Sequence, residues 1–101
     1  MMRATAPVDQ LVAVVSEPNR ARIVAELARE SLCTCHLVEI LGAGQTAVSN
    51  HLRVLRVAGV VDAHPAGRYT YYELRPAAVQ ALAEHYAGMA ASARGVERRP
   101  C

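Results

Sequence analysis

The sequence predicts a mainly α-helical domain with one β-hairpin (an α+β fold), in the order of four helices, the hairpin and a last helix. Three observations support this fold class. Apolar residues recur at helical spacing up to about residue 58, two short β-branched and aromatic runs follow, and the helical period then returns. At 101 residues the chain has the size of one domain, so we expect a single core.

The first three helices are predicted from their apolar stripes. The first stripe has i, i+3, i+4, i+7 spacing and consists of Val8, Leu11, Val12 and Val15. Pro18 stands at the expected start of the second helix, whose predicted stripe is Ala21, Val24, Leu27 and Ala28. A third, short helix is expected from Thr34 or Cys35 to Leu41, and Gly42 suits the left-handed position that closes a helix.

The fourth helix follows a tight connector, Gly42-Ala43-Gly44, of the kind that joins two helices at a steep angle. We expect it to run over residues 45–58, with a buried line of Val48, Leu52 and Leu55. Residues 60–64 and 69–74 are predicted strands, and residues 65–68 carry the turn between them. Pro76 opens the last helix. We therefore expect a folded domain over residues 1–95 and a flexible tail over residues 96–101.

Composition excludes several classes of protein. Hydrophobic residues make up 52% and charged residues 20%, which is typical of a globular protein. The sequence lacks the signature of a secretory signal or a membrane span, so a cytoplasmic protein without a membrane partner is expected. Two of the three cysteines are one residue apart, which makes a disulfide framework improbable and favours free thiols. No βαβ unit beside a thiol and no catalytic triad stands out, so we expect no enzyme.

The fourth helix presents a polar face suited to DNA. Its outward residues can donate hydrogen bonds, none of them is acidic, and they share one side of the helix: Gln45, Thr46, Ser49, Asn50, Arg53 and Arg56. Such side chains pair with base edges and phosphates in a major groove. Any amphipathic helix exposes a polar face, but a steep helix pair followed by a hairpin with Arg68 at its tip is the winged helix-turn-helix arrangement. Arg68 is then predicted to contact phosphate or the minor groove.

These segments together resemble the ArsR/SmtB family of metalloregulatory repressors. The matching motifs cover nearly the whole chain: Glu17-Pro18-Asn19-Arg20, Leu32-Cys33-Thr34-Cys35, Gln45-Thr46-Ala47-Val48-Ser49-Asn50-His51-Leu52, Ala58-Gly59-Val60-Val61 and Gly67-Arg68-Tyr69. Gly44 stands where members often have a capping Ser, and Glu17 where they often have Asp. The resemblance places His51 in the helix-turn-helix, which favours DNA contact or packing over metal binding. A core-facing role is favoured for Tyr71 and Tyr72.

The predicted sensor is the pair Cys33 and Cys35 at the start of the third helix. Unpaired backbone N–H groups and the helix dipole favour the thiolate there, and thiolate is the form that binds metal. A close thiolate pair suits soft ions, namely arsenite, antimonite, cadmium, lead and mercury. Buried cysteines can also serve as small hydrophobic residues, an alternative that weakens for two cysteines at a helix start.

The resemblance reduces the number of ions expected to act as the inducer. Leu-Cys-x-Cys at this position resembles the sensing motif of arsenic- and antimony-responsive members, whereas cadmium and lead sensors add cysteines from an N-terminal arm, and residues 1–7 contain none. As(III) or Sb(III) is therefore the expected inducer, with no prosthetic group. A third donor is left open. Cys101 is the remaining thiol and His36 an alternative, although neighbouring helix residues point in different directions.

The first and last helices carry apolar, Ala-rich faces that suit packing against a twin, so we expect a homodimer that reads a palindromic operator in double-stranded DNA. Ion capture by Cys33 and Cys35 is expected to change the spacing of the half-sites and to release the DNA. Two alternatives keep the same fold: a thiol-based redox switch and a cadmium or lead sensor. A small thiol enzyme is the alternative from another class.

Overall fold

The computed structural model describes residues 5–101, so the first four residues of the domain predicted over residues 1–95 lie outside it. Its elements follow one another as α1 (Val8–Val15), α2 (Pro18–Leu27), β1 (Leu32–Cys33), α3 (Thr34–Leu41), α4 (Gln45–Val57), β2 (Val61–Ala66), β3 (Tyr69–Leu74) and α5 (Pro76–Ala93). The order of four helices, a hairpin and a helix is confirmed, as is the winged helix-turn-helix fold class.

The core lies where α1 to α4 meet the base of the sheet. The predicted buried line of α4 is confirmed, since Val48, Leu52 and Leu55 are fully buried. Leu11, Ile23 and Leu37 from the three preceding helices pack in the same cluster. Removing these side chains from water is the main force that holds the helices together.

The predicted stripe of α2 was wrong in part. Ile23 and Leu27 are buried, whereas Ala21 and Ala28 are exposed. Ala stripes are ambiguous because a methyl group gains little from burial, and the larger side chain of Ile23 decides which face of the helix turns inward.

Local backbone chemistry sets the helix ends as expected. Pro18 is the first residue of α2, and the carboxylate of Glu17 caps that helix by accepting a hydrogen bond of 2.8 Å from the backbone N–H of Arg20. Gly42 closes α3 with a φ of 64°, a conformation that costs other residues more than glycine.

The sheet has one strand more than the sequence predicted. The short strand β1 pairs with β3 in an antiparallel ladder, which gives the order β1-β3-β2. The predicted four-residue turn was also too long, because Pro65 and Ala66 belong to β2 and only Gly67 and Arg68 form the loop. Pro65 is tolerated because β2 is an edge strand, and Gly67 has a φ of 63°, as a type II′ turn requires at its first loop position.

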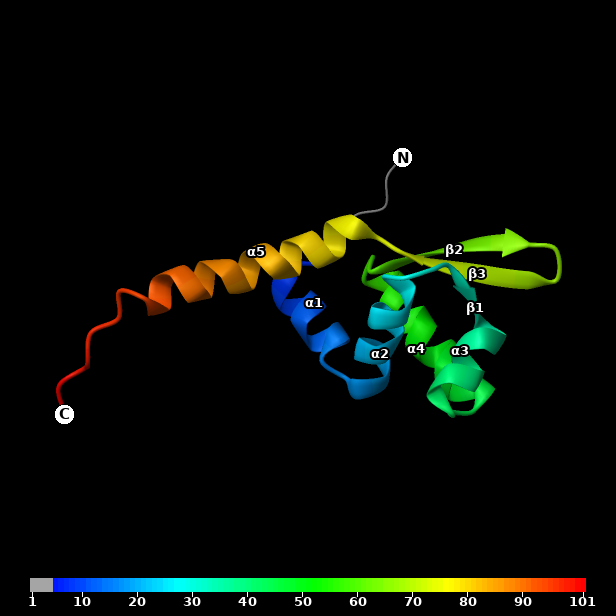
Figure 1. Cartoon of the computed structure of the whole chain (residues 1–101), viewed down its shortest axis with the longest axis horizontal. Coiled ribbons are helices and arrows are strands. Elements are labelled where there is room, and N and C mark those ends of the chain that lie inside the picture. Colours follow the sequence, from blue (N-terminus) through cyan, green and yellow to red (C-terminus); the bar gives the residue numbers. More distant parts are fainter. Residues whose placement is uncertain (1–4) are drawn as a thin grey trace.

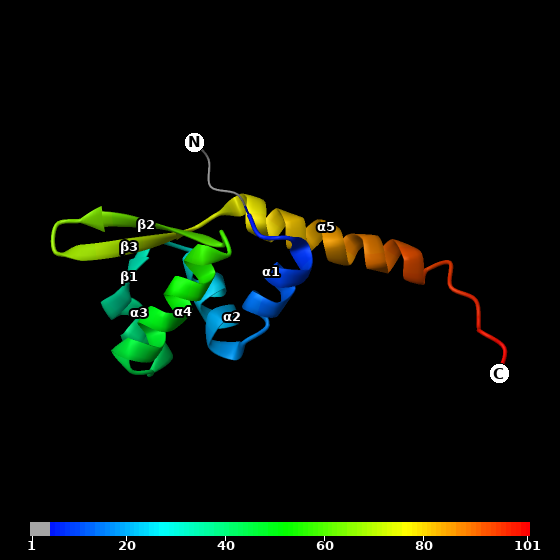
Figure 2. The same cartoon turned by 180° about the vertical axis from the view of Figure 1, so that it is seen from behind.

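The molecule is elongated, with extents of 60 × 34 × 21 Å. The wing formed by β2 and β3 extends from one side of the helical body, and α5 extends from the other (Figures 1 and 2). Helix α5 packs against α1 near the start of α5, and Ala78 is the only buried residue of α5. Within residues 5–101, no helix has both the length and the apolar character needed to cross a bilayer.

Candidate metal centre and nucleic-acid interface

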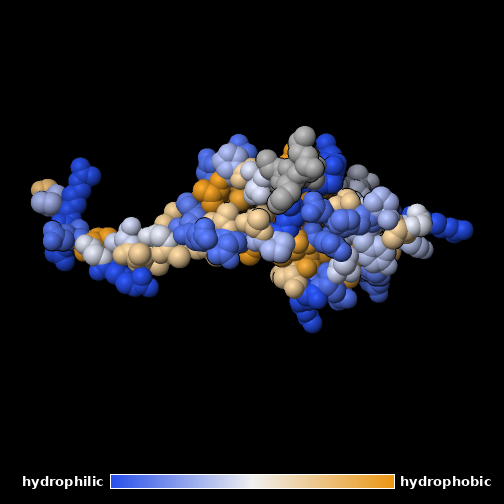
Figure 3. Space-filling model, turned by 90° about the horizontal axis from the view of Figure 1, so that it is seen from above, coloured by the Kyte–Doolittle hydropathy of each residue, from blue (hydrophilic) through white to orange (hydrophobic). Residues whose placement is uncertain are grey.

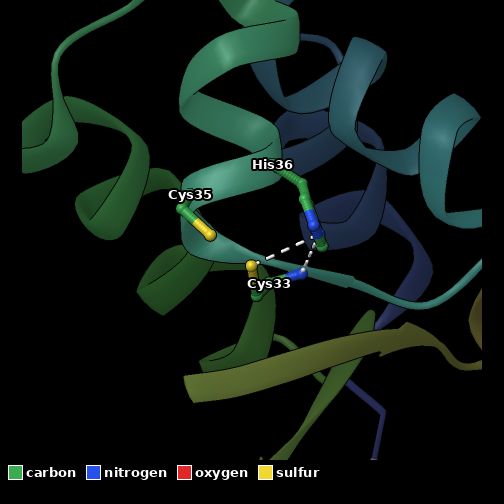
Figure 4. Close-up of side chains that lie close together, drawn as sticks. All are labelled: Cys33, Cys35 and His36. Atoms are coloured by element: carbon green, nitrogen blue, oxygen red, sulfur yellow. Dashed lines mark hydrogen bonds between the residues drawn. The ribbon is translucent and has the colours of Figure 1, made fainter. Parts of the chain in front are cut away.

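The two predicted sensor thiols lie at the junction of β1 and α3. Cys33 ends β1 and is also the N-cap residue of α3, with extended backbone angles (φ −88°, ψ 168°), while Cys35 is the second residue of that helix. The side chain of Cys33 is buried and that of Cys35 is exposed. Because one residue is extended and the other helical, both sulfur atoms are turned to the same side of the junction (Figure 4).

The side chain of His36 lies close to both thiols. One possible ligand atom from each of Cys33, Cys35 and His36 lies within 4.8 Å of the others. The backbone N–H of Cys33 donates to Nδ1 of His36 at 3.1 Å, and the sulfur of Cys33 lies 3.2 Å from the same nitrogen (Figure 4). This is the geometry of a capping box, in which the residue three positions after the N-cap reaches back to it.

The sequence argument against His36 overlooked that capping geometry. Neighbouring residues inside a helix diverge, but Cys33 is not inside the helix, and an N-cap residue lies on the same side as the third helical residue. The spacing of Cys33 and His36, three residues apart at a helix start, was the signal that could have identified the contact.

The pKa values of the two thiols are shifted in opposite directions. Burial raises the pKa of Cys33, but hydrogen bonds from the Cys35 thiol and from the backbone N–H groups of His36 and Cys35 outweigh it, so the net pKa is lowered. The pKa of Cys35 is raised, chiefly because its thiol donates to Cys33, with burial and the nearby Cys33 charge adding to the effect. Cys33 is therefore the first thiolate of the pair.

The two thiols line a pocket that α4 and the wing also line. Its volume is about 350 Å³, and residues from three segments line it: Cys33, Thr34 and Cys35 of the β1–α3 junction, Gln45 of α4, and Arg68, Tyr69, Thr70 and Tyr72 of the wing. A group bound to the sulfur atoms would thus lie within one pocket of the first residue of α4 and the tip of the hairpin.

The exposed face of α4 has the composition expected from the sequence. Five of the predicted DNA-binding side chains are exposed and Arg56 is half-buried; the exposed ones are Gln45, Thr46, Ser49, Asn50 and Arg53. Arg53 donates a hydrogen bond to the side-chain oxygen of Asn50 across one turn of the helix. Arg68 is exposed at the tip of the wing. These residues keep their polar groups available to an outside partner.

His51 differs from its neighbours on α4, because it faces α2. Its side chain is only 16% exposed, and Nη1 of Arg20 lies 3.2 Å from Nδ1 of the imidazole, while a carboxylate oxygen of Glu17 lies 3.6 Å from the same atom. Of the roles that the sequence left open for His51, this arrangement favours helix packing.

Tyr71 and Tyr72 of β3 have different surroundings. Tyr72 is half-buried and packs against the core, as expected, and Tyr71 is half-buried beside His36, with ring centroids 6.1 Å apart in an edge-to-face arrangement. Tyr71 therefore forms one wall around the imidazole of the thiol cluster.

Cys101 lies apart from the cluster. It is exposed at the chain end, and Figures 1 and 2 both place that end opposite α3 along the long axis of the molecule. Within one chain the third donor beside the two thiols is His36 rather than Cys101. A contribution of Cys101 from a second subunit stays a prediction.

Comparisons with known proteins identify the family. The model of the bacterial regulatory protein arsR family matches residues 17–63. A crystal structure of a possible transcriptional regulator for arsenical resistance superimposes with a TM-score of 0.74 and 30% sequence identity over 87% of this chain and 98% of that one. The chain belongs to the arsR family of bacterial regulatory proteins.

Relatives within the arsR family are named for different ions. The cadmium resistance regulator CadC of Listeria innocua is 36% identical over 72 residues, which cover 70% of this chain and 60% of CadC. The arsenic resistance regulator ArsR1 of Pseudomonas putida is 38% identical over 63 residues, which cover 61% of this chain and 49% of ArsR1. The chain thus spans half to three fifths of the length of these curated relatives.

Proposed function

We propose that this arsR-family chain is a metalloid-responsive transcriptional repressor. A homodimer binds palindromic operator DNA, and As(III) or Sb(III) bound to Cys33 and Cys35 releases it. One observation carries the proposal: the thiols share a pocket with Gln45 of α4 and Arg68 of the wing. An inducer at the sulfur atoms therefore touches the same pocket as the two elements that contact DNA in a winged helix-turn-helix.

The DNA side of the proposal rests on charge and exposure. The outward face of α4 combines amide, hydroxyl and guanidinium groups, which suit base edges and phosphates, and its first turn carries no acidic residue. Arg68 extends the cationic surface to the wing tip. We assign base reading to Gln45, Ser49 and Asn50 and phosphate contacts to Arg53, Arg56 and Arg68, with Thr46 serving either role.

The proposed dimer is supported by apolar surface that a single chain leaves exposed. Tyr86 and Met89 of α5 are about half exposed (51% and 53%), and Val79 is 37% exposed. Figure 3 shows pale, weakly hydrophobic side chains along much of this projecting helix. Such a surface suits the two-fold contact of identical subunits, because the same patch then covers itself.

The chemistry of the thiol pair supports a soft inducer. Arsenite, As(OH)₃, condenses with two thiols to give a dithiolate As–OH and two molecules of water, so no redox partner is needed. The lowered pKa of Cys33, produced by hydrogen bonds that outweigh burial, supplies the nucleophile for the first bond. Cadmium is the second candidate, because CadC, a cadmium resistance regulator, is among the similar proteins.

The test is a DNA-release titration. An operator is first selected from random-sequence duplexes, and its binding is followed by fluorescence anisotropy at fixed salt while arsenite, antimonite or cadmium is added. We expect arsenite to weaken binding by about 5–150-fold, the range of an ordinary coupling of 1–3 kcal/mol.

The matched control is the double variant Cys33→Ser with Cys35→Ser, which keeps size and polarity but not thiolate chemistry. It should bind operator as the wild type does and ignore arsenite. Release by arsenite in this variant, or no release in the wild type, would contradict the proposal. Release by peroxide alone would favour a redox switch instead.

A further inference from the structure

We propose that Arg20 and His51 position α4 against α1, and that their contact sets the distance and angle between the two copies of α4 in a dimer. Arg20 belongs to α2 and His51 to α4, and neither residue has to touch DNA for this role. The inference rests on the proposed function, because it names the residues that fix the geometry with which a dimer reads two half-sites.

The guanidinium of Arg20 contacts two other helices at once. Its Nε donates a hydrogen bond of 2.6 Å to the backbone carbonyl of Val14 in the last turn of α1. Its Nη1 lies 3.2 Å from Nδ1 of His51 on α4. Arginine suits this position because its planar fork presents several N–H groups in a fixed geometry, whereas lysine has one terminal nitrogen. Arg20 therefore joins α1 to α4 through one rigid group.

The contact with α1 uses a group that the end of a helix leaves free. The last carbonyl groups of a helix have no partner within it, and the carbonyl of Val14 is one of these. A cation at this end also interacts favourably with the helix dipole. From the same turn of chain, Glu17 caps α2 through the N–H of Arg20 at 2.8 Å, and its carboxylate lies 3.6 Å from Nδ1 of His51. Two charged groups of opposite sign thus meet at this imidazole.

The apolar face of α4 does not fix the orientation of the helix by itself. Val48, Leu52 and Leu55 bury the helix, but burial of apolar surface is non-directional and tolerates small rotations. Hydrogen bonds weaken steeply away from their preferred geometry, so the polar contacts of His51 select one orientation. Its side chain is only 16% exposed, so little water competes for these contacts. The polar face of α4 turns together with His51.

The place of α1 in the fold gives this contact its consequence for DNA. Helix α1 packs against α5, and these two helices carry the surfaces expected to form the dimer. Helix α4 carries the polar face expected to read the DNA. A contact that fixes α4 relative to α1 therefore fixes one reading helix relative to the other across the two-fold axis.

The experiment compares duplexes that differ in the spacing of their half-sites. The operator selected for the full-length protein is used unchanged, with two base pairs inserted between its half-sites, and as a duplex with a single half-site. Two base pairs turn one half-site by about 70° relative to the other, at about 10.5 base pairs per turn. Because one mismatched base pair already weakens binding several-fold, we expect the insertion to weaken wild-type binding by at least about tenfold.

Two variants break the contact in different ways. Arg20→Lys keeps the charge but reaches only one of the two helices, and His51→Leu removes the imidazole. We expect both to reduce the penalty for the insertion by about threefold or more, within the range seen when residues between two coupled sites are changed. Their affinity for the single half-site should match that of the wild type.

Each variant has a matched partner. His51→Asn places an amide group where Nδ1 lies and should restore the spacing preference that His51→Leu loses. Arg29→Lys makes the same substitution as Arg20→Lys at an exposed arginine just after α2, and it should behave as the wild type does.

A purely structural role gives a different result. It lowers the urea midpoint and the affinity for all three duplexes together, and it leaves the spacing preference unchanged. That outcome, or weaker binding of His51→Leu to the single half-site, which indicates a direct DNA contact, would overturn the inference. A wild type that tolerates the inserted base pairs counts instead against the proposed function, because a dimer that reads two half-sites must discriminate between these duplexes.

Discussion

Cys33 lies directly opposite Tyr71 in the ladder that joins β1 to β3. Strand β3 is also one of the two strands of the wing, so the buried thiol and the wing belong to one hydrogen-bonded sheet. Movement at Cys33 therefore reaches the wing through backbone pairing, in addition to the contact of α3 with α4.

This pairing predicts a local change in the wing on ion capture. Arsenite should alter hydrogen-exchange protection at Tyr71 and Tyr72, whose partners in β1 are Cys33 and Leu32, and should leave the buried start of α5 around Ala78 unchanged. Exchange measured by NMR with and without arsenite checks this. A response confined to α4, with β3 unaffected, would contradict coupling through the sheet.

Arg68→Ala should weaken DNA binding without weakening the fold, because the side chain is exposed at the wing tip. Losing one phosphate contact should reduce the slope of log affinity against log salt by about 1. Anisotropy titrations at several salt concentrations measure that slope. Arg94→Ala, at the end of α5, is the control, and an equal effect of both changes would argue against a specific wing contact.

The two glycines of the α3–α4 connector should respond in opposite ways. Neither would bring an added Cβ within 4 Å of another atom, so only backbone conformation separates them. Gly42→Ala places a side chain at a φ of 64° and should destabilise the protein by about 1–2 kcal/mol. Gly44→Ser supplies the missing N-cap side chain of α4 and should stabilise it by about a few tenths of a kcal/mol. Urea unfolding of both variants measures these differences, and an unaffected Gly42→Ala would disprove the strain argument.

Acid should remove the contribution of Glu17 to stability. A hydrogen bond from the backbone N–H of Arg20 is the main cause that lowers the pKa of Glu17, with smaller contributions from the N–H of Asn19 and the charges of His51 and Arg20, against an opposing effect of burial. Since the folded pKa lies below the unfolded one, the stabilisation is complete above the unfolded pKa and is lost as pH falls through the folded pKa.

The measurement for Glu17 is the urea midpoint of wild type and Glu17→Ala at neutral and acidic pH. The difference between the two proteins should be present at neutral pH and should close on acidification. Glu97→Ala, in the segment after α5, serves as the control and should track the wild type throughout. A gap that persists in acid would show that the side chain stabilises the fold by packing rather than by charge.

Much of the fold could be predicted from local patterns. Helical periodicity predicts the buried line Val48, Leu52 and Leu55. The left-handed backbone conformation of Gly42 was predictable because only glycine adopts it at little cost. The thiol pair was also visible, because its two members are one residue apart. Where the local signal was weak, as in the alanine stripe of α2, the prediction failed.

The sequence by itself determined the order of the helices, the hairpin, the polar face of α4 and the presence of Cys33 and Cys35 at a helix start. Only the tertiary structure decided that β1 joins the wing, that His51 turns toward Arg20, and that the thiols share a pocket with Arg68. The reason is physical: periodicity and capping act between residues a few positions apart, whereas Cys33 and Tyr71 meet only because burial of the common core brings distant segments together.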